Sequence, residues 1–212
     1  MSSEKAAVVD VLVATGNPGK LREIRALTAR LPVRWRTLDE FPQVPPAVED
    51  GDTFAENARR KARHYSLATG LWALADDSGL EVDALGGAPG VHSAHYAGVP
   101  RDDQANNRKL VAALAGVTAA ARTARFRCAL ALADGARILL EADACVAGCI
   151  LDEPRGAHGF GYDPLFLLPE LGCTLAELPD AEKNARSHRG AALRAFLPSL
   201  EALLRARGLW PD

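Results

Sequence analysis

The chain has 212 residues, of which 48% are apolar and 25% charged, and its formal net charge is −2. This length can bury a sizeable core, and we expect one domain over residues 1–212, with residues 1–7 as a short flexible extension. The charge excludes a general basic surface for nucleic acid. Because no apolar run is long enough to cross a membrane and the first residues lack a signal-peptide core, we expect a cytoplasmic protein without a membrane partner.

The first predicted elements are a strand and a helix joined by a tight turn. Residues 8–14 form an almost unbroken apolar run, typical of a buried strand. Residues 21–27 space their apolar side chains at helical intervals. The turn between them reads Thr15-Gly16-Asn17-Pro18-Gly19-Lys20. Asn17 can cap the helix, and Pro18 suits its first position, where no amide hydrogen is needed.

Lys20 makes this turn a candidate anion site. A lysine in the first turn opposes the helix dipole, and a bound phosphate would remove that conflict. The standard phosphate loop is not matched, since Gly16 and Gly19 have two residues between them and Leu21 follows the lysine. The alternative is a turn that uses glycine and proline for geometry alone.

An acidic group is predicted at the end of the next strand. Thr53 begins a helix through about residue 69, with Glu56 completing a capping box. The short apolar strand 71–75 then stops at Asp76-Asp77-Ser78-Gly79. Adjacent carboxylates repel each other unless a proton or cation lies between them, and Mg2+ prefers such oxygens. Glu49, in an earlier acidic loop, could supply another oxygen. The alternative is that these residues only end the strand.

The second half of the chain predicts a hairpin followed by helices. Residues 101–114 are helical in pattern, residues 123–133 alternate as a strand, and Asp134-Gly135 is a hairpin turn. A Gly- and Pro-rich loop covers 152–164. The remainder is predicted to be mainly helical, interrupted at Pro198. Strands that alternate with helices and then form a hairpin indicate an α/β fold with a mixed sheet flanked by helices.

Two late segments carry residues that suit a nucleotide. In the loop Gly159-Phe160-Gly161-Tyr162-Asp163-Pro164, Phe160 could stack on a base and Asp163 could accept a hydrogen bond from a ring NH. Both aromatic residues could instead be core. Near a helix junction, Lys183 could meet phosphate, while His188 and Arg189 could donate to a carbonyl edge. A solvated charged helix end is the alternative.

Taken together and in this order, these motifs resemble the inosine/xanthosine triphosphate pyrophosphatase family, which hydrolyses non-standard purine nucleoside triphosphates. The resemblance covers residues 8 to 207. Its motifs are Thr15 to Lys20, Phe54-Ala55-Glu56-Asn57-Ala58 with Lys61, Ala75 to Leu80, Gly159 to Pro164, Glu182-Lys183-Asn184, and Ser187-His188-Arg189. One departure is His95, which stands where many relatives carry arginine.

The resemblance implies an elongated mixed α/β fold of two lobes with the active-site cleft between them, a homodimer, and Mg2+ as cofactor. Asp77 would be the catalytic proton acceptor and, with Glu49 and Asp76, would hold the metal. The substrate-binding residues would be Thr15, Gly16, Asn17, Pro18, Gly19, Lys20, Asn57, Lys61, Ser78, Phe160, Gly161, Tyr162, Asp163, Lys183, His188 and Arg189.

The expected reaction is hydrolysis of ITP, dITP or XTP to the nucleoside monophosphate and pyrophosphate. Donors from His188 and Arg189 would favour a purine with a carbonyl at position six over adenine. Rejection of guanine is implied by the family alone. Two alternatives are a Maf-like nucleotide pyrophosphatase of different base specificity and a non-catalytic nucleotide-binding module.

Overall fold

A computed structural model describes residues 8–210. The predicted flexible extension, residues 1–7, lies outside the described residues. The chain forms two compact units. Among the described residues, unit 1 comprises 8–77, 129–143 and 192–210, and unit 2 comprises 78–128 and 144–191. No helix between residues 8 and 210 has both the length and the apolar character needed to span a bilayer.

Seven strands form one mixed sheet in the order β2-β1-β3-β4-β5-β6-β7. The strands are β1 Val9–Val13, β2 Val33–Arg36, β3 Trp72–Val82, β4 Thr123–Asp134, β5 Arg137–Ile150, β6 Phe166–Leu168 and β7 Cys173–Thr174. β1 pairs in parallel with β2 and β3, whereas β6 pairs antiparallel with β5 and β7. The mixed sheet with flanking helices confirms the predicted α/β class.

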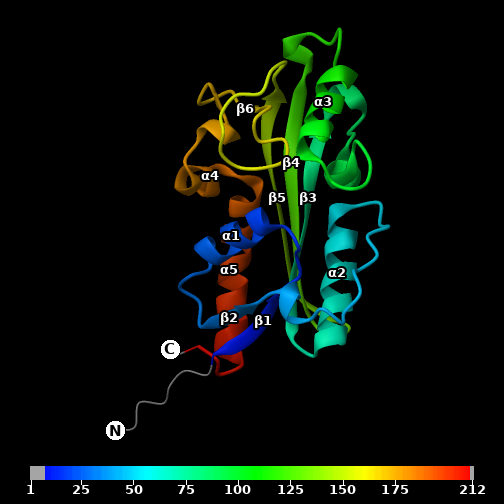
Figure 1. Cartoon of the computed structure of the whole chain (residues 1–212). Coiled ribbons are helices and arrows are strands. Elements are labelled where there is room, and N and C mark those ends of the chain that lie inside the picture. The colour runs from blue at the N-terminus through cyan, green and yellow to red at the C-terminus, as the bar shows by residue number, and fades with distance from the viewer. Residues whose placement is uncertain (1–7, 211–212) are drawn as a thin grey trace. The chain divides into compact units, whose positions relative to one another are not determined.

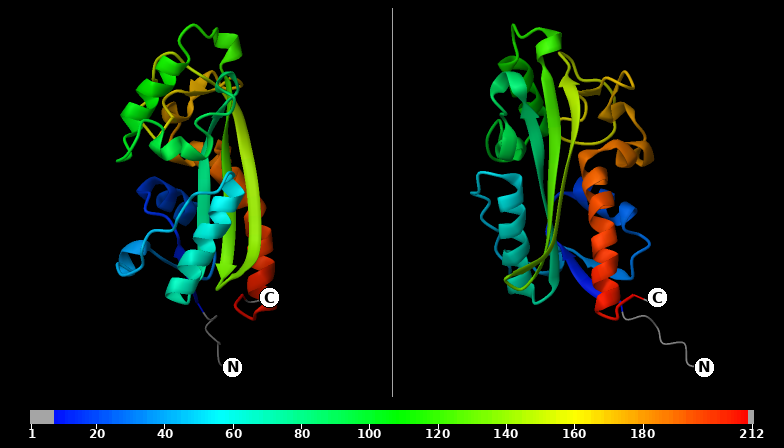
Figure 2. Two further views of the ribbon diagram at one scale, coloured as in Figure 1. Left: turned by 90° about the vertical axis from the view of Figure 1, so that its right-hand side faces the viewer. Right: turned by 180° about the vertical axis from the view of Figure 1, so that it is seen from behind.

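Unit 1 surrounds the parallel part of the sheet. It contains α1 Pro18–Leu27, α2 Phe54–Thr69 and residues 192–206 of α5 His188–Ala206. Figures 1 and 2 show α2 on one face of these strands and α5 on the other. As predicted, Asn17 caps α1, since its Oδ1 accepts from the Gly19 amide at 2.8 Å. Burial of the apolar side chains between these helices and strands is the main contribution to the stability of the unit.

Unit 2 packs around the remaining parts of β3, β4 and β5. It also contains β6, β7, α3 Asp103–Ala113 and α4 Asp180–Arg186. Figures 1 and 2 show α3 and α4 on opposite sides of these strands. Leu80, Leu110, Phe126 and Phe166 belong to its buried core. Short 3-10 turns complete the chain: η1 Leu38–Glu40, η2 Asp83–Leu85, η3 Gly90–His95, η4 Ala119–Ala121 and η5 Leu175–Glu177.

Three sequence predictions about these elements were wrong. β3 does not stop at residue 75 but continues to Val82, because lysine partners neutralise its carboxylates inside the sheet. α5 runs through Pro198 without a break. Thr53 caps α2 as expected, but the Glu56 carboxylate accepts from the amide of Asp52 rather than from that of Thr53.

Candidate active site

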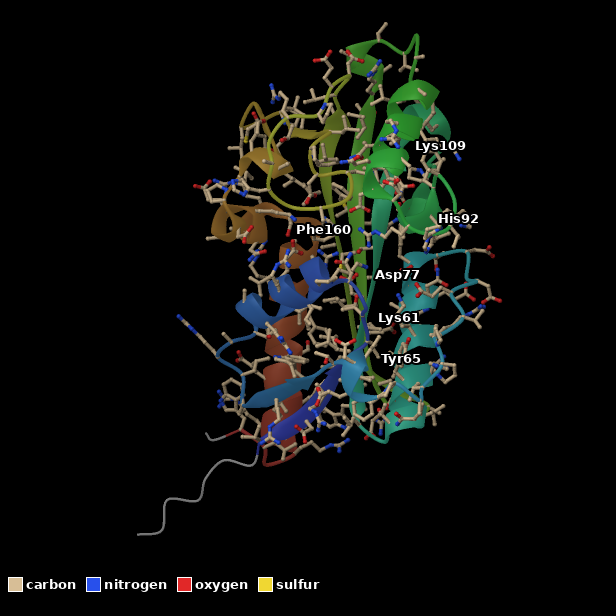
Figure 3. All side chains as sticks on the ribbon, in the orientation of Figure 1. Lys61, Tyr65, Asp77, His92, Lys109 and Phe160 are labelled. Atoms are coloured by element: carbon tan, nitrogen blue, oxygen red, sulfur yellow. The ribbon has the colours of Figure 1, made fainter. Side chains whose placement is uncertain are left out.

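One cluster of candidate site residues, the carboxylate–lysine cluster, lies in unit 1 and consists of Glu49, Asp76, Asp77, Lys20 and Lys61. Lys61 Nζ lies 2.6 Å from Glu49 Oε2 and 3.7 Å from Asp77 Oδ1. Lys20 Nζ lies 2.5 Å from Asp76 Oδ1. Figure 3 shows Lys61 on α2 with Asp77 beside it. Segments far apart in the sequence therefore meet here, as the sequence predicted for these five residues.

Asp77 has the most unusual environment in this cluster. Its side chain is only 10% exposed, and Oδ2 accepts no hydrogen bond from any residue between 8 and 210. Burial raises the pKa of Asp77 to about 6, against the opposing attraction of Lys61 and Lys20. A carboxylate that titrates near neutral pH with an unused oxygen can take a proton or bind a cation.

Asp76 is held on the other side of the same strand. Its side chain is fully buried and pairs with Lys20 of α1, while Asp77 pairs with Lys61 of α2. Successive residues of a strand point to opposite faces, which explains the two different partners. Asp76 thus supplies the negative charge that Lys20, in the first turn of α1, was expected to take from a phosphate.

The turn of residues 15–20 is built as a helix cap. Oδ1 of Asn17 accepts from the amides of Gly19 and Lys20, and Thr15 Oγ1 accepts from the Asn17 amide. An anion bound here must therefore share these amide donors with the two side-chain oxygens or displace those oxygens as acceptors. A Cβ on Gly16 would meet nothing within 4 Å, and this residue has no positive φ. Neither packing nor backbone conformation requires a glycine there, so the space beside Gly16 is open to a ligand.

Side chains of α2 fix the loop that carries Glu49. Asn57 is buried, and its amide accepts from the Gly51 N–H at 2.8 Å and donates to the Gly51 carbonyl at 3.4 Å. The Tyr65 hydroxyl accepts from the Ala47 amide. Asn57 was predicted to touch substrate, and the structure places it as a support for the acidic loop. Lys61 is thereby kept close to Glu49, and the two carboxylates around Lys61 raise its pKa although burial opposes its charge.

The cluster suits Mg2+ in the chemistry of its donors. Three carboxylates and two ammonium groups leave a surplus of negative charge, and one buried oxygen of Asp77 lacks a partner. Oxygen donors of this kind are those that Mg2+ prefers. Within residues 8–210 no three such side chains already stand together as a metal-holding group. Glu49 and Asp77 share Lys61, so a cation that replaces this ammonium would meet both carboxylates, whereas Asp76, predicted as a third metal ligand, faces Lys20 on the other side of the strand.

A second cluster of candidate site residues, the aromatic–cation cluster, lies in unit 2 and consists of Phe160, Asp163, Lys183, His188 and Arg189. Phe160 is half-buried. Lys183 Nζ lies 4.4 Å from the centre of its ring, and the Arg189 guanidinium carbon lies 5.6 Å from it. Lys183 also pairs with Asp163 at 2.7 Å, with both side chains buried. The accessible ring among cations offers a surface on which a flat base can stack.

Two further contacts fix the side chains of His188 and Arg189. Arg189 donates to Ser78 Oγ at 2.9 Å, and the His188 ring stacks on Phe126 with the centroids 4.7 Å apart. Phe126 is a neighbour of the site that sequence reasoning missed, because its alternation in β4 indicated only that it faces inward. Since His188 and Arg189 begin α5, both side chains are fixed by a rigid element.

Tyr162 and Asp163 have structural contacts of their own. Tyr162 is buried, its hydroxyl donates to the Ser93 carbonyl at 2.9 Å, and burial raises its pKa. Asp163 Oδ2 accepts from the Phe160 amide at 2.9 Å. The two aromatic residues of this loop thus differ, since Tyr162 is core and Phe160 is partly accessible.

Comparison with known proteins identifies the family. The model of the Ham1 family matches residues 11–199. The dITP/XTP pyrophosphatase of Geobacter sulfurreducens is 54% identical over 185 residues, covering 86% of this chain and 92% of that protein. The dITP/XTP pyrophosphatase of Shouchella clausii is 46% identical over 203 residues, with 95% and 98% covered.

Solved structures agree with this assignment. A HAM1 protein from Coxiella burnetii superposes with a TM-score of 0.82 at 42% identity, covering 93% of this chain and 99% of that one. Because the matched region contains both clusters and the matching relatives are near full length, the chain belongs to the Ham1 family.

Proposed function

We propose that this protein hydrolyses non-standard purine nucleoside triphosphates (ITP, dITP and XTP) to the nucleoside monophosphate and pyrophosphate, with Mg2+ as cofactor. The observation that carries the proposal is Asp77, a buried carboxylate that lies 3.7 Å from Lys61, has one unpartnered oxygen and has a pKa of about 6. Relatives named dITP/XTP pyrophosphatase support the substrate class.

The triphosphate is assigned to the carboxylate–lysine cluster. Lys20 and Lys61 are both nearly buried, so their charges act strongly on phosphate oxygens. A bound Mg2+, held by Glu49 and Asp77, would neutralise charge on the phosphates and lower the pKa of a bound water. With phosphate bound, Lys20 and Lys61 would exchange their carboxylate partners for phosphate oxygens.

Asp77 is assigned the proton transfer. In its ionised form it accepts a proton from the water that attacks the α-phosphorus, and the bond to the pyrophosphate leaving group breaks. Its unpartnered oxygen leaves one acceptor available for that water. Lys20 and Lys61 stabilise the negative charge that develops on the departing pyrophosphate.

The base is assigned to the aromatic–cation cluster. Phe160 stacks on the purine, and His188 and Arg189 donate to the carbonyl at position six. Adenine carries an amino group there, so two donors would face each other and stay unpaired. Ser78, which accepts from Arg189, is the residue next to Asp77 in β3, so the two clusters are adjacent along the chain.

A pyrophosphate-release assay tests the proposal. Purified protein is given ITP, XTP, GTP or ATP, each with Mg2+ and with EDTA. We expect release from ITP and XTP with Mg2+, little release from ATP, and none with EDTA. Equal rates with ATP would contradict the donor argument, and release with EDTA would contradict the metal requirement. Binding of ITP without any turnover would indicate the non-catalytic alternative.

We also propose a homodimer in the cytoplasm, on the basis of the family resemblance alone. Light scattering after size-exclusion chromatography would measure the mass in solution. A mass of one chain at micromolar concentration would contradict the dimer.

A further inference from the structure

In the loop that presents Phe160, the residue Gly161 makes two hydrogen bonds to side chains of α3. The Gly161 amide donates to Asp103 Oδ2 at 2.8 Å, and the Gly161 carbonyl accepts from Asn107 Nδ2 at 3.0 Å. Asp103 and Asn107 are four residues apart and thus lie on one face of α3. The backbone N–H and C=O of Gly161 are therefore both hydrogen-bonded to side chains of α3.

This attachment matters because the loop has an unusual backbone. Gly159 and Gly161 have φ angles of 76° and 62°, in the left-handed region that favours glycine. Because glycine has many accessible backbone conformations, contacts from other parts of the protein are needed to hold the loop in this one. Asp163 binds the Phe160 amide, and α3 binds the next residue. The orientation of the Phe160 ring depends on both.

The N-cap of α3 does not depend on these two side chains. Asp102 already caps the helix, with its Oδ1 accepting from the Ala105 amide at 2.9 Å. Asn107 leaves Oδ1 buried without a partner among the described residues, which costs free energy. An apolar side chain there would avoid that cost but would release the Gly161 carbonyl.

We propose that Asp103 and Asn107 are positioning residues for base recognition: they hold Gly161 and thereby set the Phe160 ring against the purine. The inference rests on the proposed function for the identity of the base. It extends that function to a helix with no assigned role in the reaction. The phosphate half of the substrate should not depend on these contacts.

Two variants of Asp103 separate the loop contact from charge. Both Asp103→Ala and Asp103→Asn remove the carboxylate that pairs with Arg101 at 2.7 Å. Only Asp103→Asn keeps an oxygen that can accept from the Gly161 amide. Asn107→Asp is an independent second variant, because it replaces the donor with an oxygen that faces the Gly161 carbonyl. Thermal unfolding identifies any variant that fails to fold.

The binding experiment uses two probes by calorimetry, inosine monophosphate and inorganic tripolyphosphate with Mg2+. Loss of one buried hydrogen bond predicts a Kd for inosine monophosphate about 10-fold higher in Asp103→Ala and Asn107→Asp. Asp103→Asn should stay near the wild-type Kd, and the tripolyphosphate Kd should be unchanged in all three. For ITP turnover, KM should rise in the same two variants with kcat nearly constant.

Hydrogen exchange of the 159–163 segment gives a readout that needs no substrate. In Asp103→Ala, hydrogen exchange at the Gly161 amide should be faster than in wild type. In Asp103→Asn, the rate should be the same as in wild type. Equal inosine monophosphate affinities for Asp103→Ala and Asp103→Asn, or a parallel fall in tripolyphosphate affinity, would overturn the inference. Failure of the proposed function is distinct, because the wild-type protein would then release no pyrophosphate from ITP.

Discussion

Lys61 Nζ lies 2.6 Å from Glu49 and 3.7 Å from Asp77, so one buried ammonium joins an exposed loop carboxylate to a buried strand carboxylate. Burial raises the pKa of Asp77, and the positive charge of Lys61 makes that rise smaller than burial alone would. The lysine also occupies the position that a cation needs. A metal ion that binds Glu49 and Asp77 would therefore have to displace the Lys61 ammonium.

Asp77→Asn should abolish turnover while the protein remains folded. The amide has nearly the same shape but cannot accept the proton from water, and removal of a general base costs about 10²- to 10⁴-fold in rate. Pyrophosphate release from ITP measures the loss. Circular dichroism and thermal unfolding serve as the control. Wild-type-like activity in this variant would remove Asp77 from the mechanism.

Asp77 should also make stability depend on pH when metal is absent. Its folded-state pKa of about 6 lies above the ordinary 3.8, so the folded state binds this proton more tightly than the unfolded state. The resulting stabilisation is complete below the ordinary value and is lost as pH rises through about 6.

Asp77→Asn does not titrate and should escape this loss. Relative to wild type, its free energy of unfolding in EDTA should increase by about 3 kcal/mol between about pH 4 and about pH 8. Urea titrations at a series of pH values measure the difference. A constant difference across that range would contradict the raised pKa.

Phe160→Ala should weaken base binding with little effect on chemistry. Loss of one base-stacking ring costs about 1–3 kcal/mol, which predicts a KM for ITP about 10- to 100-fold higher. Phe160→Tyr keeps the ring between Lys183 and Arg189 and is the matched control. Steady-state kinetics separates the two parameters. A fall in kcat with constant KM would contradict the stacking role.

Replacement by alanine should affect the stability of the protein differently at two glycines. At Gly148 a Cβ would lie 2.5 Å from the Leu167 carbonyl oxygen and 2.6 Å from the Phe166 ring, so Gly148→Ala should destabilise the fold by about 1–3 kcal/mol. Gly16→Ala meets nothing within 4 Å and should unfold like wild type. Chemical denaturation compares the two.

The same Gly16→Ala variant tests where phosphate approaches. Its KM for ITP should rise although its stability is unchanged, because the added methyl group occupies the open space beside the turn. An unchanged KM would show that the substrate does not approach Gly16.

Local signals in the sequence predicted the helix starts well. Asn17 and Thr53 cap their helices because capping depends on a few neighbouring residues. The course of β3 could not be predicted in the same way. Asp76 and Asp77 interrupt an apolar run, and only Lys20 and Lys61, which are distant in sequence, make their burial tolerable. The strands β6 and β7 are too short to show a period.

For the candidate site, residue identity was easier to predict than role. Lys61 does lie beside acidic residues, and Phe160 does lie beside basic residues. Asn57 and Tyr162, by contrast, bind the protein's own backbone, and no pattern of residue types distinguishes that from binding a ligand. The contacts of Asp103 with Gly161 span 58 positions in sequence and become visible only in the fold.

Because β3 continues through its acidic residues, the direction in which the Asp77 side chain points depends on the number of residues in the strand. Successive side chains of an extended strand point to opposite faces of the sheet. A shift of one position therefore moves each carboxylate to the other face. Inserting or deleting one residue between Trp72 and Asp76 would turn Asp77 toward α1 and away from Lys61, even with every side chain intact. Length variation should therefore be far less tolerated here than in the loops that flank α3.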